Sequence, residues 1–194
     1  MASGRAEIEF VDGGGRTRLA RLYQSDPLRV LFPNVGPGET ETGTLVTTSG
    51  GLVGGDDLTI KLACGAGATA RVVGQAAEKI YRSMGDDVRI EMSLTAGPGS
   101  WLEWLPQETI IFDTARLRRR TVLHVAPGGR ILAGEIIVLG RTAMGETVTG
   151  GLVHEAWDVR RDDRLVWADT VHLDDHMPAT LAANAGLNGA HAFA

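Results

Sequence analysis

The side chains best suited to chemistry in this sequence are carboxylates set among apolar residues and glycines. Asp56 closes a turn built around two glycine pairs, and Glu78 and Glu135 fall inside otherwise apolar, strand-like segments. A charge on an apolar face lowers stability unless it is paired, hydrated or functional. The sequence leaves two arrangements open for these inner charges, a water-filled passage or a simple ion pair.

The glycine-rich turn at residues 50–56 is not typical of an enzyme loop. It lacks the Gly-Lys-Ser/Thr ending of a phosphate-binding loop, and no helical pattern follows it. Ser49 is not flanked as in a Gly-x-Ser-x-Gly elbow, which argues against a serine nucleophile. The simplest interpretation is a tight acidic turn that joins two strands.

One histidine group has the spacing of a metal site. His172, Asp174 and His176 could converge on a single ion, which would favour a metal-dependent enzyme on a β scaffold. The alternative is a solvated acidic loop before a helix, with Asp174 or Asp175 as the helix cap.

A basic run at residues 116–120 departs from the acidic balance of the chain. On a strand, Arg118 and Arg120 would point one way, and Arg119 would point the other way together with Leu117. We therefore expect at least one of these arginines to pair with a carboxylate inside the fold or at an interface. The second informative stretch places Trp101 and Trp104 near Pro106, a rigid apolar surface that suits either a core or a partner contact.

The composition excludes several classes of function. The 194 residues carry a formal charge of −5, which disfavours nucleic acid as the main partner. The single cysteine, Cys64, excludes an internal disulfide and a cysteine zinc cluster. The sequence shows neither a secretory signal nor an apolar run that could span a membrane, so we expect a cytoplasmic protein.

Alternating apolar and polar residues dominate the chain and predict one mainly β domain of many short strands over residues 1–194. The clearest example is residues 88–94, where apolar and polar side chains strictly alternate. Residues 33–38 read as a loop, residues 130–139 as one strand, and residues 177–185 as a short helix. We find no strict internal repeat, which argues against a regular solenoid.

Four separated motifs resemble a known family. They are GGLVGGD at 50–56, QAAEKIYRS at 75–83, EWLPQETIIFD at 103–113 and LGRTAMGE at 139–146. Together, and in this order, they resemble the urease accessory protein UreD, called UreH in some bacteria.

This resemblance implies a coiled or helix-like β fold with one or two short helices and no enzymatic activity. It implies a urease maturation factor that binds the accessory protein UreF, and through UreF the GTPase UreG, and that docks onto apo-urease. Nickel would pass through its interior in transit, with no permanently bound cofactor. The resemblance also implies that the chain lacks the C-terminal part of the family, which would leave strand edges exposed.

The resemblance also implies roles for single residues. Asp56, Glu78 and Glu135 are the candidates for carboxylates that line the nickel passage. Carboxylates suit a divalent ion that must bind weakly and leave, whereas a cysteine and histidine chelate would trap it. The candidates for partner binding are Trp101, Trp104, Pro106 and Arg118.

Overall fold

The computed structural model describes residues 1–36 and 38–194; Pro37, in the predicted loop 33–38, lies outside them. The strands in chain order are β1 (Ser3–Asp12), β2 (Thr17–Ser25), β3 (Leu28–Leu31), β4 (Glu41–Thr47), β5 (Asp57–Cys64), β6 (Thr69–Gly74), β7 (Glu78–Ile80), β8 (Val88–Ala96), β9 (Trp101–Leu105), β10 (Thr109–Ile111), β11 (Arg116–Val125), β12 (Arg130–Ala133), β13 (Ile137–Leu139), β14 (Leu152–Arg161), β15 (Arg164–Leu173) and β16 (Ala192–Phe193). The helical segments are a 3-10 turn, η1 (Thr142–Met144), and the helix α1 (Met177–Ala182).

The strands form because side chains alternate between a buried and an exposed face, as the sequence predicts. In β8, Val88, Ile90, Met92 and Leu94 are buried, and the residues between them face outward. Strands β5 and β11 show the same alternation. This period of two places one face of each strand in the core.

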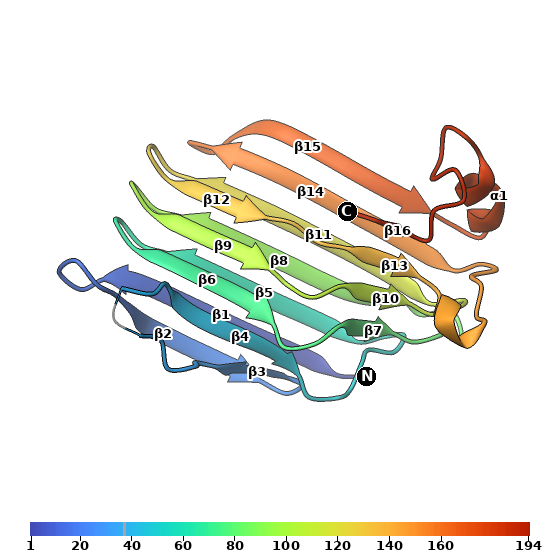
Figure 1. Cartoon of the computed structure of the whole chain (residues 1–194), viewed down its shortest axis with the longest axis horizontal. Coiled ribbons are helices and arrows are strands. Elements are labelled where there is room, and N and C mark those ends of the chain that lie inside the picture. Colours follow the sequence, from blue (N-terminus) through green and yellow to red (C-terminus); the bar gives the residue numbers. More distant parts are fainter. Residues whose placement is uncertain (37) are drawn as a thin grey trace.

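Successive coils of the chain stack on one another, which confirms the predicted mainly β, coiled arrangement. Each coil runs through one strand of each of three sheets: β5, β6 and β7, then β8, β9 and β10, then β11, β12 and β13. Within the described residues, the sheet orders are β15-β14-β11-β8-β5-β1-β2, β12-β9-β6-β4-β3 and β16-β13-β10-β7. Figure 1 shows these coils side by side, with the β14–β15 hairpin at one edge and β2 and β3 at the other.

The coils differ in length, which explains why the sequence shows no strict repeat. Among the parallel strands of the seven-stranded sheet, Leu58 pairs with Ile90, Ile90 with Arg119, and Arg119 with Glu155. These steps correspond to 32, 29 and 36 residues, so equivalent positions recur at unequal intervals. The stack is therefore solenoid-like without a regular repeat.

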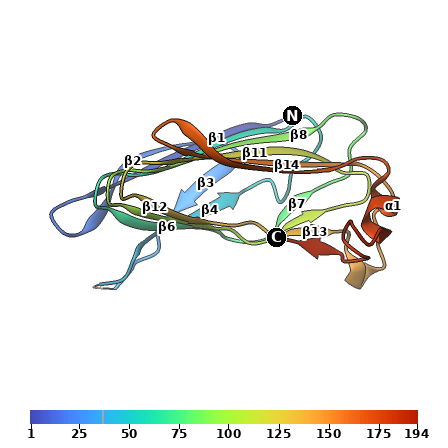
Figure 2. The same cartoon turned by 90° about the horizontal axis from the view of Figure 1, so that it is seen from above.

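The core lies between two layers (Figure 2). One layer is the seven-stranded sheet, and the two smaller sheets together form the other. Phe10, Leu62 and Leu94 from the large sheet and Leu102 from the opposite layer are all fully or almost fully buried. This apolar core holds the polar groups described below in fixed positions.

Two local predictions are wrong in their bounds. Residues 130–139 form two strands, β12 and β13, because the chain passes from one small sheet to the next through Gly134, Glu135 and Ile136. Glu135 therefore lies in a bend and not on a strand. The predicted helix 177–185 is present as α1 but ends at Ala182. Its N-cap residue is His176, which makes no side-chain capping hydrogen bond, so the expected cap by Asp174 or Asp175 is not formed.

The described part of the chain contains no helix that is long and apolar enough to cross a membrane.

Candidate functional site

An arginine occupies the interior of the coil stack. Arg119 is in the middle of β11, and alternation along that strand turns it inward with Leu117 and Thr121, while Arg118 and Arg120 face outward. Its side chain is only 6% exposed. The expectation that one arginine of this run pairs inside the fold is confirmed.

Two carboxylates and a hydroxyl surround the Arg119 guanidinium. Nε donates to both carboxylate oxygens of Glu155, at 2.9 and 3.0 Å. Nη2 forms an ion pair with Oε2 of Glu135, and Nη1 donates to Oγ1 of Thr109 at 3.2 Å. We call Arg119, Glu135 and Glu155 the ion cluster.

The members of the ion cluster come from opposite walls of the stack. Arg119 and Glu155 are in register on the neighbouring parallel strands β11 and β14. Glu135 reaches them from the bend between β12 and β13, where the indole Nε1 of Trp104 donates to its Oε1 at 3.1 Å. The cluster therefore connects the two layers through charged groups.

Burial and neighbouring charges perturb the protonation of this cluster. Burial raises the pKa of the Glu155 carboxyl to about 7; the charge of Glu135 also raises it, and Arg119 opposes the shift. Burial by itself would lower the pKa of Arg119, but the charges of Glu135 and Glu155 outweigh it and raise that pKa. Arg119 thus stays charged, and Glu155 can exchange a proton near neutral pH.

A further carboxylate approaches the cluster from the preceding coils. Glu78, on β7, is in register with Thr109 on β10, and Thr109 contacts Arg119. The Thr47 hydroxyl donates to Oε2 of Glu78, and the Lys79 amide donates to Oε1 at 3.0 Å. Burial raises the pKa of Glu78 above its usual value. Glu78, Thr109 and the ion cluster thus follow one another on neighbouring coils, and we call this series of polar groups the polar path.

Two cavities adjoin this path. The first, about 270 Å³, is lined by Glu78, Thr109 and Arg119 among apolar side chains. The second, about 460 Å³, is lined by Glu135 and Glu155 and by aromatic side chains of the last coil. Since Arg119 lines the first cavity and its two carboxylate partners line the second, the ion cluster lies between them.

Asp56 is placed apart from the other predicted passage residues. It is buried in the glycine-rich turn, where the Ala2 amide donates to Oδ1 at 2.6 Å and the Val53 amide donates to Oδ2 at 3.0 Å. It does not line the cavity that Glu78 lines. The structure thus brings Glu78 and Glu135 to the same polar path and gives Asp56 a turn-stabilising position; its role in a passage stays a prediction.

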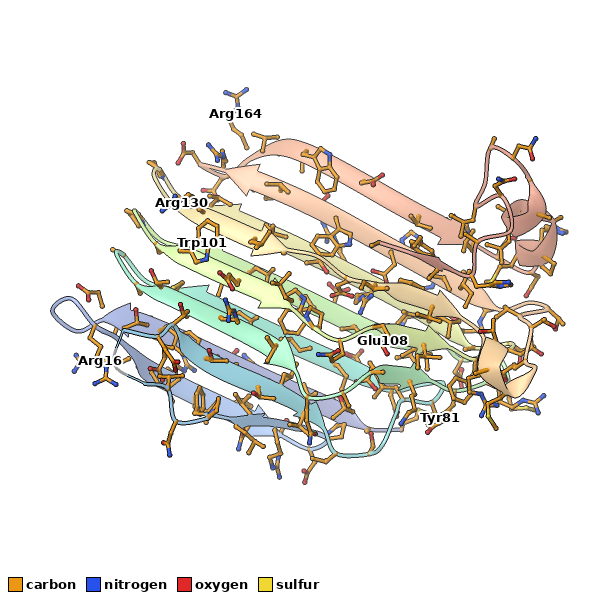
Figure 3. The ribbon with its side chains drawn as sticks, viewed as in Figure 1. Arg16, Tyr81, Trp101, Glu108, Arg130 and Arg164 are labelled. Atoms are coloured by element: carbon orange, nitrogen blue, oxygen red, sulfur yellow. The ribbon has the colours of Figure 1, made fainter. Side chains whose placement is uncertain are left out.

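The four candidates for partner binding fall in different environments. Trp104 is a core residue, 4% exposed. Trp101 is half-buried, with the Arg130 guanidinium 5.1 Å from its ring centre, and Figure 3 shows the two side chains next to each other. Pro106 is half-buried at the rim of the first cavity, and Arg118 faces outward, where its Nε donates to Asp87 at 2.5 Å.

The histidine group is not assembled into a metal site. The His172 ring contacts His154, and Asp174 Oδ1 accepts a hydrogen bond from the backbone amide of His176 at 3.0 Å. Across residues 1–36 and 38–194, no group of three or more His, Cys, Asp or Glu side chains is arranged to hold a metal ion. His172, Asp174 and His176 therefore do not form the metal site that the alternative of a metal-dependent enzyme required.

Glu155 is the one member of the ion cluster that was not predicted from the sequence as a site or pairing residue. A signal was present, because Glu155 alternates with His154 and lies on the same face of β14 as the apolar Val153 and Trp157. The pairing of Glu155 with Arg119 could not be predicted from the sequence, since this pairing depends on the register between two coils.

Comparison with known proteins gives a consistent result. Residues 2–194 match the family model described as UreD urease accessory protein. The chain is 46% identical over 187 residues to "Urease accessory protein UreD" of Magnetococcus marinus, covering 96% of this chain and 65% of that protein. It is 44% identical over 187 residues to the protein of that name from Rhodopseudomonas palustris (strain BisA53), covering 96% and 64%, and 38% identical over 193 residues to that of Rhizobium etli, covering 100% and 70%. The chain thus spans about two thirds of the length of these relatives.

Proposed function

The chain belongs to the UreD urease accessory protein family, and from this premise we propose that it is a non-enzymatic scaffold of urease maturation that passes nickel through its interior. The observation that carries the proposal is the ion cluster between two cavities. Charged groups buried this deeply call for a functional explanation, because removing each of them from water is energetically unfavourable.

The ligands along the polar path suit an ion in transit. Glu78, Glu135 and Glu155 offer carboxylate oxygens, which hold a borderline divalent cation such as Ni²⁺ less firmly than thiolates or imidazoles do. Conduction requires binding that is favourable enough for entry and weak enough for release. Several carboxylates in succession meet both requirements.

Arg119 would control the step between the cavities. Its guanidinium occupies the carboxylates of Glu135 and Glu155, so a cation can reach both only if the arginine moves aside. Glu155, whose pKa is raised to about 7 by burial, would release its proton as the cation arrives. The same carboxylates then either neutralise Arg119 or carry the nickel ion.

The partners in this proposal are UreF, UreG through UreF, and apo-urease. Trp101, Pro106 and Arg118 are partly exposed and remain the candidates for these contacts. The aromatic ring and the arginine are side chains that interfaces favour.

The test is urease activation in cells that lack their own scaffold gene. These cells would carry the present chain, or a version extended to the length of the relatives, as wild type and as the double variant Glu135→Gln/Glu155→Gln. Asp158→Asn is the matched control, because Asp158 is also on β14 but pairs with Arg120 on the outer face. Urease activity, nickel per urease and retention of UreF would be measured together.

We expect the double variant to retain UreF while nickel per urease falls at least tenfold, with the control unchanged. A folded double variant that loads urease fully would overturn the interior passage. Failure of every wild-type version to retain UreF or activate urease would overturn the scaffold itself.

A further inference from the structure

Two histidines meet on the outer face of the large sheet, away from the ion cluster. His154 on β14 and His172 on β15 are directly opposite each other in the antiparallel pair. Their Nδ1 atoms are 3.2 Å apart, and the ring centres are 5.4 Å apart at an interplanar angle of 70°. His154 faces outward because the next residue, Glu155, points into the interior.

The surroundings leave this pair open on one side. β15 is the outermost strand of its sheet within the described residues, and His172 is exposed to solvent. On the other side, Arg118 of β11 is in register with His154. Asp87 pairs with both Arg118 and Arg116, and so offsets part of their positive charge.

Each ring of the pair can offer a nitrogen atom to a metal ion. A neutral imidazole has an unprotonated nitrogen that can bind a metal ion. Without a metal, two facing Nδ1 atoms can share only one proton, so one ring must donate and the other accept.

The separation of the two nitrogens fits a chelate. Nitrogen ligands lie about 2.0–2.1 Å from a bound transition metal, so two of them at angles between about 90° and 110° are roughly 2.9–3.4 Å apart. The Nδ1 atoms of His154 and His172 fall within this range. Occupancy by an ion would then require little movement of either strand.

We propose that His154 and His172 form a surface chelate for a divalent transition-metal ion that favours imidazole, such as Ni²⁺, Zn²⁺ or Cu²⁺. The described residues supply no third side chain to this site, so water completes the coordination. Binding is therefore exchangeable and weaker than in closed sites with three or four protein ligands.

The experiment is calorimetric titration of the purified full chain with Ni²⁺ and with Zn²⁺ at pH 7.5 and at pH 5.5. Variants are His154→Ala and His172→Ala, and circular dichroism verifies their folding. The controls are His176→Ala, which tests the predicted His172, Asp174 and His176 group, and Asp158→Asn, which removes an outward-facing carboxylate of the same strand β14. Nitrogen-15 NMR of the wild-type imidazoles follows Zn²⁺ addition independently of any variant.

We expect a site at pH 7.5 that weakens at least tenfold in each of the two histidine variants, stays unchanged in the controls and disappears at pH 5.5. Zn²⁺ should shift the Nδ1 signals of both rings. Binding that survives either His154→Ala or His172→Ala, or that His176→Ala removes, would overturn the chelate. NMR signals that do not move would show that the pair is a hydrogen bond only.

Discussion

The two ends of the coil stack fill the same interior column with opposite chemistry. In the earlier coils the column consists of Leu58 and Ile90, which are almost fully buried among apolar side chains. In the later coils the positions in register with them are Arg119 and Glu155, equally buried but charged. Backbone pairing continues across this change without interruption.

This difference distinguishes the apolar residues that stabilise the fold from the buried charges, whose presence needs another explanation. Apolar burial stabilises by roughly 25 cal/mol per Å² removed from water, and this suffices for the β5–β8 end. Buried ion pairs are often no more stabilising than apolar side chains of the same size. Stability therefore does not explain the charged column at the β11–β14 end, and the ion transit proposed above would account for it.

Removing the central charge should produce the largest effect. Arg119→Ala leaves Glu135 and Glu155 buried without their cation, and we expect a loss of about 3–5 kcal/mol in the free energy of unfolding at pH 8. The loss should be smaller at pH 5, because protonation removes the uncompensated charges. Urea denaturation at both pH values measures this; an equal loss at the two pH values would contradict the electrostatic cause.

Truncating the apolar end of the column should cost somewhat less and show no pH dependence. Leu58 is 1% exposed, and Leu58→Ala leaves a cavity that we expect to lower the free energy of unfolding by about 3 kcal/mol. The same urea series at pH 5 and pH 8 provides the comparison with Arg119→Ala. A pH-dependent loss here would remove the distinction between the two ends.

The protonation of Glu155 predicts a pH dependence of the wild type. Its folded pKa of about 7 lies above the usual carboxyl value, so the folded state binds the proton more tightly than the unfolded chain. The corresponding stability is present below about pH 4.5 and is lost as pH rises to about 7, a change on the order of 1–3 kcal/mol. Glu155→Gln should flatten this part of the stability profile; an unchanged slope would assign it to another group.

Removing an exposed ion pair should have the smallest effect on stability. Arg71 pairs with Glu103 at the surface, where the arginine side chain is 44% exposed. We expect Arg71→Ala to change the free energy of unfolding by only about 0–1 kcal/mol, and less in high salt. Thermal unfolding at two salt concentrations measures this change. A loss of stability as large as that of Arg119→Ala would mean that burial does not determine how much an ion pair contributes.

Much of the local structure follows from the sequence alone. Alternation in segments such as 88–94 and 117–125 predicted which face of each strand is buried, because the side-chain period of a strand is fixed at two. The same rule placed Arg119 on the face opposite Arg118 and Arg120, and we expected at least one of these arginines to pair with a carboxylate. The motifs at 50–56 and 103–113 contribute to the family resemblance, and that resemblance implied the coiled β fold.

Only the tertiary structure decided which carboxylates Arg119 meets. Alternation along a strand determines the face on which a side chain lies, but not the residue that it contacts. That contact depends on the register between coils, and the turns make one coil 29 residues long and the next 36. Glu135 enters the cluster because the chain bends between two small sheets, where the sequence predicted one continuous strand. The pairing of His154 with His172 depends in the same way on the hairpin register of β14 and β15, a long-range property that no local pattern specifies.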